Sequence, residues 1–426
     1  MKKILIAAML LAAYAATAQD TNKVSIKPYG FIRNYLTFDT RNTYTVVGGE
    51  YNMIPYDRHL VDGVDVNDYV HGEMQALTSR VGLAISGPAL FGMRSSGKLE
   101  GDFGGFGTNN HVFRIRLAYM KLAKSDGREH FEVLAGQDWH PLSGDIMPDV
   151  LGMAAGAPFR PHSRTPQLRA TYYNGSFGFT TALLWQLQYM NNGPASYDDP
   201  TSTASLDFAR NAVVPEMFVG FNYRLGPWYA QLGLDGQVLS PRVYATIGGV
   251  VQQVDEIVWS VTPTLYAQYV EGMWSLKFRT MLAENTSHLN QLCGYAVTGI
   301  YDDGSWCYSP MNATISYLNI AYGRKYRANL FLGYMKNLGA EENLYDFGGG
   351  DYRIYMKGGD SFTHLGSVWR LAPSISYNVK AFNMGLEYEV TACTYGDLAA
   401  NGSIMDNANL RQVVNHRLCA LVKYNF

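Results

Sequence analysis

Charged side chains recur at alternate positions along several strand-like stretches of this chain. Seven cations share one face by this alternation: Arg33, Arg80, Lys98, Arg114, Arg116, Arg169 and Arg417. Six acids are expected on the same face or opposite it: Glu100, Asp102, Glu132, Asp138, Asp145 and Asp149. Arginine keeps its charge at any physiological pH, and its planar fork matches carboxylate and phosphate groups. Such a wall could attract and orient anions, while the acids would keep it from being uniformly positive.

The elements that hold these charges are expected to be β-strands. Within 78–142, apolar and charged residues alternate; Leu83 opposes Arg80, and Leu117 opposes Arg114 and Arg116. This period of two is the signal of a strand with two different faces. In a soluble sandwich the apolar face would pack on a core, whereas in a transmembrane barrel it would meet lipid. The alternation alone fits both architectures.

The first eighteen residues have the form of a secretory signal. Lys2 and Lys3 precede an apolar run, and Ala16-Thr17-Ala18 is a small-residue cleavage site, so we expect 1–18 to be removed. No cysteine stands at the cut, which argues against a lipoprotein. The mature part, 19–426, shows no linker or change of composition that would divide it.

Composition and link lengths favour the transmembrane barrel. Charged residues make up only 16% and aromatic residues 13%, with 31 tyrosines, as expected for aromatic girdles at membrane interfaces. We find about sixteen segments of roughly ten residues, the length that crosses a bilayer at a tilt. Apart from four within 78–142, the expected spans are 24–39, 166–173, 177–187, 215–224, 228–238, 258–269, 274–284, 313–322, 327–337, 367–377, 382–395 and 414–426. Short turns alternate with long polar links, as in outer-membrane barrels. We therefore predict an all-β, antiparallel, up-and-down barrel.

The last strand has a feature of its own. Its apolar residues alternate up to Tyr424 and Phe426, where the sequence ends on an aromatic side chain. This form resembles the C-terminal signal by which the insertion machinery recognises outer-membrane barrels. A net charge of −2 argues against a nucleic-acid partner.

Several blocks resemble the DcaP-like trimeric porins of Gram-negative outer membranes. They are Thr78-Ser79-Arg80-Val81-Gly82, Gly97-Lys98-Leu99-Glu100-Gly101-Asp102-Phe103, Phe113-Arg114-Ile115-Arg116-Leu117-Ala118-Tyr119 and Leu134-Ala135-Gly136-Gln137-Asp138-Trp139-His140-Pro141. The stronger part covers 73–173. The resemblance implies sixteen strands, a homotrimer and passive uptake of small, often anionic solutes. It also implies that the link 140–165 folds inward as a constriction loop, with Asp138, Asp145 and Asp149 facing the basic wall. No heptad-rich helical stretch follows Gln19, unlike in some members of that family.

Enzyme signatures are not found in the sequence. It contains no G-x-S-x-G, no GxxxxGK[ST] and no H-E-x-x-H, and we expect no catalytic residue and no cofactor. His140 and His162 flank the link 140–165, but neither has a partner at ligand spacing, so a structural or pore-lining role is favoured over a metal site. The alternatives to a porin are a barrel enzyme of lipase or protease type and a secreted all-β binding protein.

Four cysteines complete the set of chemically informative residues. Cys293 and Cys307 lie in one long link of an exported chain, which suggests a loop-closing disulfide. Cys393 and Cys419 share the inward face of neighbouring strands and form a second possible pair, although sequence does not give their separation.

Overall fold

The computed structural model describes residues 23–47, 49–105, 112–143 and 146–426. The expected signal sequence, 1–18, and Asp145 lie outside these ranges. Within the described part of the chain, no helix combines the length and the apolarity needed to cross a bilayer.

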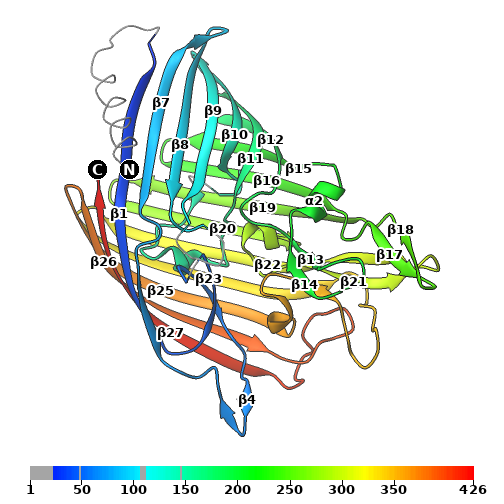
Figure 1. Ribbon diagram of the computed structural model, residues 1–426. Coiled ribbons are helices and arrows are strands. Elements are labelled where there is room, and N and C mark those ends of the chain that lie inside the picture. Colours follow the sequence, from blue (N-terminus) through cyan, green and yellow to red (C-terminus); the bar gives the residue numbers. More distant parts are fainter. Residues whose placement is uncertain (1–22, 48, 106–111, 144–145) are drawn as a thin grey trace, which may run out of the picture.

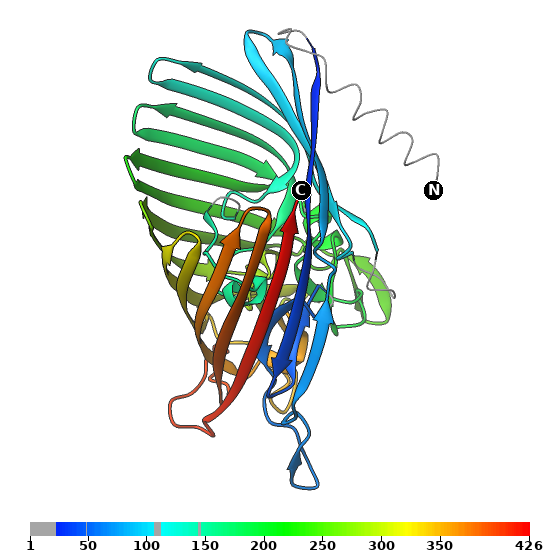
Figure 2. The same ribbon diagram turned by 90° about the vertical axis from the view of Figure 1, so that its left-hand side faces the viewer.

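Sixteen long antiparallel strands close into a barrel (Figure 1). In order around the ring they are β1 (Ser25–Asp39), β7 (Arg80–Leu90), β8 (Met93–Asp102), β9 (Arg114–Asp126), β10 (Glu129–Trp139), β11 (Arg164–Asn174), β12 (Phe177–Leu184), β15 (Glu216–Leu225), β16 (Trp228–Leu239), β19 (Val258–Glu271), β20 (Trp274–Glu284), β22 (Trp306–Gly323), β23 (Tyr326–Ala340), β25 (Leu365–Val379), β26 (Phe382–Tyr395) and β27 (Arg411–Asn425). The ring closes where β1 pairs with β27, and Figure 2 shows the blue first strand beside the red last strand. The predicted fold class is therefore confirmed.

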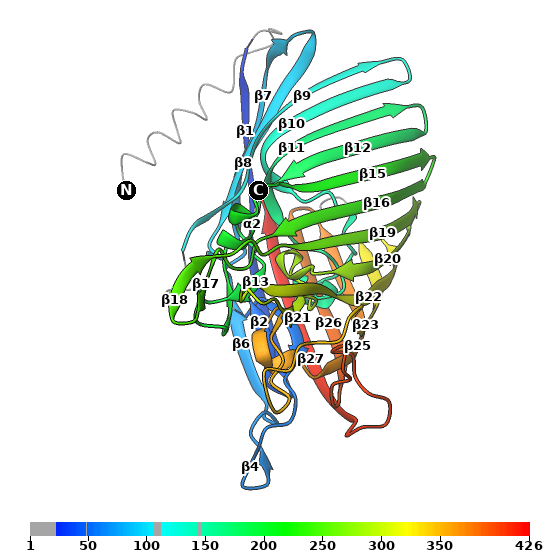
Figure 3. The same ribbon diagram turned by 90° about the vertical axis from the view of Figure 1, so that its right-hand side faces the viewer.

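The shorter elements lie in the long links between these strands. They are β2 (Thr43–Val46), β3 (Tyr51–Pro55), β4 (Leu60–Val61), β5 (Val64–Asp65), β6 (His71–Gln75), η2 (Met153–Gly156), β13 (Asn192–Pro194), β14 (Ser202–Ala204), α2 (Asp207–Asn211), β17 (Tyr244–Ile247), β18 (Val250–Gln253), η3 (Ser287–Leu289), β21 (Tyr295–Ile300), β24 (Ile354–Tyr355) and η4 (Gly359–Phe362). Figure 3 shows the labelled link elements gathered at one end of the barrel strands, away from the short turns. This asymmetry between long and short connections is the one expected for an outer-membrane barrel.

The two faces of the barrel wall are inverted relative to a soluble protein. Along β19, Trp259, Val261 and Leu265 point outward and are exposed, whereas Ser260 and Thr262 between them are buried on the inner side. Burying polar groups while leaving a belt of large apolar side chains uncovered would be unfavourable in water. The same arrangement suits a barrel with lipid outside and polar groups inside.

A β-bulge changes the expected faces of β9. Glu100 pairs with Leu117 and Gly101 pairs with Ile115, so Arg116 is the extra residue between them. A bulge shifts the alternation by one position. Arg116 and Leu117 therefore both face inward, and Leu117 is only 5% exposed. The prediction that Leu117 lies on the lipid-facing side was wrong.

Ser86-Gly87-Pro88 has the composition of a tight turn but does not form one. Strand β7 continues through these residues, and the chain reverses at Phe91 and Gly92, whose φ angles are +52° and +73°. The pairing with β8 is irregular between Ser86 and Ala89. Proline has no N–H for a sheet ladder, so it is tolerated at such an irregular site.

Neither predicted disulfide forms, and all four cysteines are free. In the β26–β27 register, Cys419 lies opposite Glu387 and Cys393 opposite Val413. Positions 387 and 393 are separated by roughly 20 Å, at about 3.3 Å per strand residue, far beyond the reach of a disulfide. Cys293 donates to the Met311 carbonyl at 2.9 Å, whereas Cys307 lies opposite Gly299, so the other pair is also apart.

Candidate functional site

The described residues between β10 and β11, 140–143 and 146–163, fold into the barrel and are called here the inward loop. Phe159 near its return is fully buried, and its ring lies 6.1 Å from that of Phe331 on β23. A Cβ atom on the adjacent Gly333 would lie 2.5 Å from the Phe159 ring, so glycine provides the space for this contact. The loop therefore crosses the lumen from its own strands to the opposite wall, as the fold prediction requires.

Two charged side chains on the far wall hold the inward loop in place. Both carboxylate oxygens of Glu387 on β26 accept backbone N–H groups, from Leu151 and Gly152, each at 2.9 Å. Arg370 on β25 donates to the Ala154 carbonyl at 2.7 Å and pairs with Glu389 at 3.2 Å. These charge-assisted bonds satisfy loop backbone groups that would otherwise be buried without partners.

The first long link also enters the lumen. Its strand β3 is buried throughout, and Arg370 donates to the Met53 carbonyl at 2.8 Å. Tyr51 in the same strand bonds to the ring of His162 at 2.9 Å. Strand β3 and the inward loop thus form one packed insert. The sequence did not reveal this, because a polar link carries no periodic pattern.

Asp149 anchors the inward loop to cations that sequence reasoning missed. Its carboxylate pairs with Lys277 on β20 and Arg327 on β23, each at 3.0 Å. Burial alone would raise the pKa of Asp149, but the nearby Lys277 and Arg327 and the hydroxyl of Ser275 outweigh it and lower the pKa. The ion pairs of Asp149 are therefore with β20 and β23 rather than with the first strands, although it lines the same cavity as Arg33. The same alternation that placed Arg33 also places Lys277 inward on 274–284.

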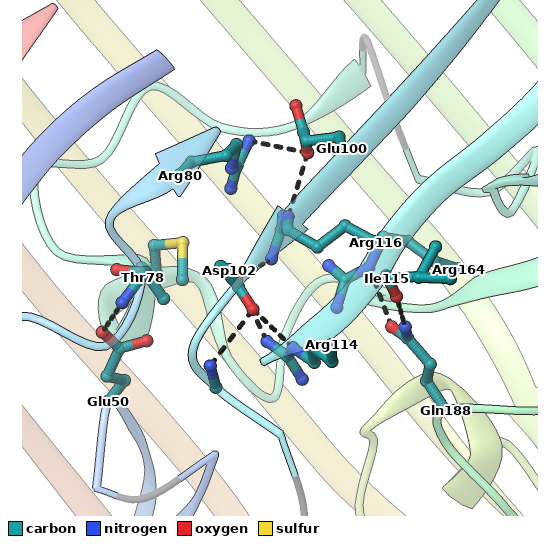
Figure 4. Close-up of polar contacts among 12 residues, drawn as sticks. Glu50, Thr78, Arg80, Glu100, Asp102, Arg114, Ile115, Arg116, Arg164 and Gln188 are labelled. Carbon is teal, nitrogen blue, oxygen red and sulfur yellow. Dashed lines mark hydrogen bonds and ion pairs between the residues drawn. The ribbon is translucent and has the colours of Figure 1, made fainter. Parts of the chain in front are cut away.

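Three of the predicted cations form a ladder with two predicted acids (Figure 4). Arg114 pairs with Asp102 at 2.7 Å, Arg116 pairs with Asp102 at 2.6 Å and with Glu100 at 3.0 Å, and Arg80 pairs with Glu100 at 3.3 Å. Arg116 is 1% exposed and Asp102 is fully buried. The ladder is thus a fixed, largely desolvated part of the wall, and much of its positive charge is compensated.

Other predicted residues pair along the wall rather than across the lumen. Arg169 bonds to Asp138 at 2.7 Å, so Asp138 does not reach across a constriction as expected. Glu132 pairs with Lys121 at 2.9 Å. Arg417 lies 3.6 Å from Asp39 and is 5% exposed.

Arg33 and Lys98 remain on the inner face without an acidic partner among the described residues. Lys423 is the partner of Arg33 in the β1–β27 register. Among the described residues, no carboxylate lies within ion-pair distance of Arg33, Lys98 or Lys423. A cavity of about 230 Å³ between the inward loop and the short-turn end is lined by Arg33, Arg327 and Lys423 and by one carboxylate, Asp149. Serine and asparagine side chains, together with Val150, Leu151 and Leu421, complete its lining. This part of the lumen can donate hydrogen bonds to an anion.

A second group of buried cations surrounds the base of the inward loop. Arg164 is fully buried and donates to Gln188 at 3.0 Å and to the Tyr189 hydroxyl at 3.2 Å, while its guanidinium lies 4.9 Å from the Trp139 ring centroid. Arg160 donates to His162 at 2.7 Å. Burial and the neighbouring Arg160 and Arg164 charges hold the pKa of His162 well below its ordinary value, so its ring is neutral.

Comparisons with known proteins agree with the architecture. No protein-family model and no curated protein matches this sequence. Among solved structures, the outer membrane channel DcaP of Acinetobacter baumannii superposes with a TM-score of 0.62 at 15% identity, covering 97% of this chain and 100% of the other. The chain has the porin fold. An anion-selective porin from Comamonas acidovorans matches this fold with a TM-score of 0.53 at 14% identity, covering 95% of this chain and 100% of that one. OmpT of Vibrio cholerae, an outer-membrane protein, matches with a TM-score of 0.51 at 11% identity, covering 96% of this chain and 99% of that one.

Proposed function

We propose that this chain is an outer-membrane porin through which small hydrophilic solutes, preferentially anions, diffuse passively. The observation that carries the proposal is a closed sixteen-stranded wall, apolar outside and polar inside, with an inward loop fixed across the lumen. A closed barrel satisfies every backbone group within the membrane. A rigid loop inside it sets the width and charge of the path.

The preference for anions follows from the cations that keep access to water. The charges of Arg33, Lys98 and Lys423 are not compensated by an ion pair with a described acid. Arg33 and Lys423 also line the 230 Å³ cavity, together with Arg327. The Arg114–Asp102–Arg116–Glu100 ladder contributes less, because its charges are paired and largely buried. Cations on a hydrated wall raise the local concentration of anions without forming a deep binding site.

The proposal includes the cellular context. The chain would be exported with 1–18 as a signal peptide, delivered to the outer membrane of a Gram-negative bacterium, and assembled there as a homotrimer. The outer faces of the first strands, within 73–120, are the candidate trimer interface. Tyr424 and Phe426 would be read by the insertion machinery. In support, Phe426 closes the barrel by exchanging backbone hydrogen bonds with Gly30 at 3.0 and 3.1 Å.

We propose no catalytic activity and no catalytic cofactor. The test is reconstitution of the purified protein into planar bilayers and liposomes. Discrete conductance steps, and liposome swelling in small sugars and small organic acids, are expected. Native mass measurement in mild detergent should give three chains. Folded protein that produces no steps and no swelling would refute the porin proposal, and a monomer would refute the assembly.

A further inference from the structure

A compact group of two histidines and two acids lies outside the ladder and the cavity described above. His140 begins the inward loop, Glu216 is the first residue of β15, Asp235 lies on β16, and His288 is in η3 of the link 285–305. None of the four side chains is more than 5% exposed. Four segments far apart in the sequence therefore meet at one buried polar point.

The geometry of the group suits a metal ion. One ligand atom each from His140, Glu216 and Asp235 lies within 4.8 Å of the other two. Nε2 of His140 and Nε2 of His288 approach the same Glu216 oxygen at 2.8 and 3.0 Å, and His140 lies 3.6 Å from Asp235. Donor atoms of one tetrahedral or octahedral ion stand about 3–4 Å apart, given ligand bonds of about 2.0–2.2 Å.

Unsatisfied lone pairs provide an independent indication. Glu216 Oε2 and Asp235 Oδ1 are buried and have no hydrogen-bond partner, although buried carboxylate oxygens normally have one. Glu216 and Asp235 are adjacent buried carboxylates, whose charges would repel each other without a cation between them. Arg279 supplies one nearby charge, but its bonded nitrogen, Nη1, donates to the Leu142 carbonyl at 2.6 Å.

We propose that His140, Glu216, Asp235 and His288 form a binding site for a divalent transition-metal ion such as zinc. Two imidazole nitrogens and two carboxylate oxygens are a donor set that such ions accept, and four protein ligands make a closed, structural site. The ion would fasten the base of the inward loop and the link 285–305 to β15 and β16. It is therefore a stabilising site that is separate from solute passage.

His140 gives the proposal a specific consequence. Its Nδ1 accepts the N–H of Leu142 at 3.1 Å, so in the neutral ring Nε2 carries the proton and donates it to Glu216. Coordination through Nε2 requires that proton to move to Nδ1, which can then no longer accept the Leu142 N–H. Binding at His140 therefore costs one buried hydrogen bond. For this reason His140 should be the weakest of the four ligands.

The experiment uses the full mature protein in detergent, without a polyhistidine tag, stripped by a chelator and then titrated with zinc. We expect about one zinc per chain to remain after dialysis and the melting temperature to rise by at least roughly 2–4 °C. The double substitution Glu216→Gln with Asp235→Asn should abolish both effects. Loss of a residue that only supports a metal ligand weakens metal binding about 10–100-fold. His288→Ala should weaken zinc binding by more than that, because it removes a ligand. His140→Ala should weaken zinc binding less than His288→Ala does.

A matched control is the exposed contact between His130 and Glu132, 3.8 Å apart. His130→Ala with Glu132→Gln should leave the zinc response unchanged. Folding of every variant is checked by the heat-dependent gel shift of intact barrels. If stripped wild-type protein retains no zinc, or melts at the same temperature with and without it, the proposal is overturned even if the double variant fails to fold. If the melting temperature responds to pH but not to zinc, the four side chains share protons rather than a metal ion, and the proposal is wrong.

Discussion

Replacing Arg116 by methionine should strongly destabilise the barrel without altering its outer surface. Arg116 is 1% exposed and is bonded to Asp102 at 2.6 Å and to Glu100 at 3.0 Å, both acids being almost fully buried. Methionine keeps the apolar stem but leaves two buried carboxylates with less compensation. Removing one partner from a buried ion pair costs about 3–5 kcal/mol. Chemical unfolding in detergent, followed by tryptophan fluorescence and gel shift, measures this loss.

Two further variants make the reasoning about Arg116 specific. Arg80→Met removes a partner that is 16% exposed and 3.3 Å from Glu100, and it should cost less than Arg116→Met, because Arg80 pairs with one carboxylate rather than two. Combining Arg116→Met with Glu100→Gln should cost less than the sum of the two single substitutions, because the pair is coupled. An Arg116→Met protein whose free energy of unfolding lies within about 0.5 kcal/mol of the wild type would show that the ladder is not desolvated as described.

Three other perturbations test separate parts of the structure. Leu232→Arg places a charge on the outer face of β16, where Leu232 is 60% exposed, and should cost about 2–4 kcal/mol of folding free energy if it lies near the bilayer centre. Lys121→Leu on the inner face should be tolerated. Unfolding in lipid vesicles compares the two variants. Phe426→Asp should reduce the yield of folded barrel in cells, since it removes the terminal aromatic residue that packs over Gly30, and normal assembly would argue against an insertion signal. The pKa of Asp149 is lowered from its ordinary 3.8, so its ion pairs stabilise the inward loop above that pH and are lost as the pH falls through the lower folded-state value. Channel noise in the wild type should therefore increase only below pH 3.8, whereas Asp149→Asn should show that noise already at neutral pH.

The strands were predictable because they follow a local rule. Alternation marked all sixteen. Outside 78–142, the predicted ends, from 24–39 to 414–426, lie within a few residues of those observed except at the start of β22. The inward direction of Arg33 and Lys98 came from the same rule, since neither of their strands is shifted near these positions.

The remaining features depend on non-local packing, which alternation does not report. The bulge at Arg116 inverted the face of Leu117, and the extra residue is recognised only from the pairing of two strands. The partners of Asp149 lie more than a hundred positions away, on β20 and β23. Likewise, the group formed by His140 and Glu216 joins positions that no sequence spacing connects.

The central claim, that uncompensated lumen cations govern passage, is tested most directly by the reversal potential of single channels in a planar bilayer under a salt gradient. The wild type should show a modest anion preference. Replacing Arg33, Lys98 and Lys423 together by glutamine should shift the potential toward cations with conductance retained, whereas Arg324→Gln on a short turn should not. A wild-type channel that already prefers cations, or a triple variant with unchanged selectivity, would contradict the account.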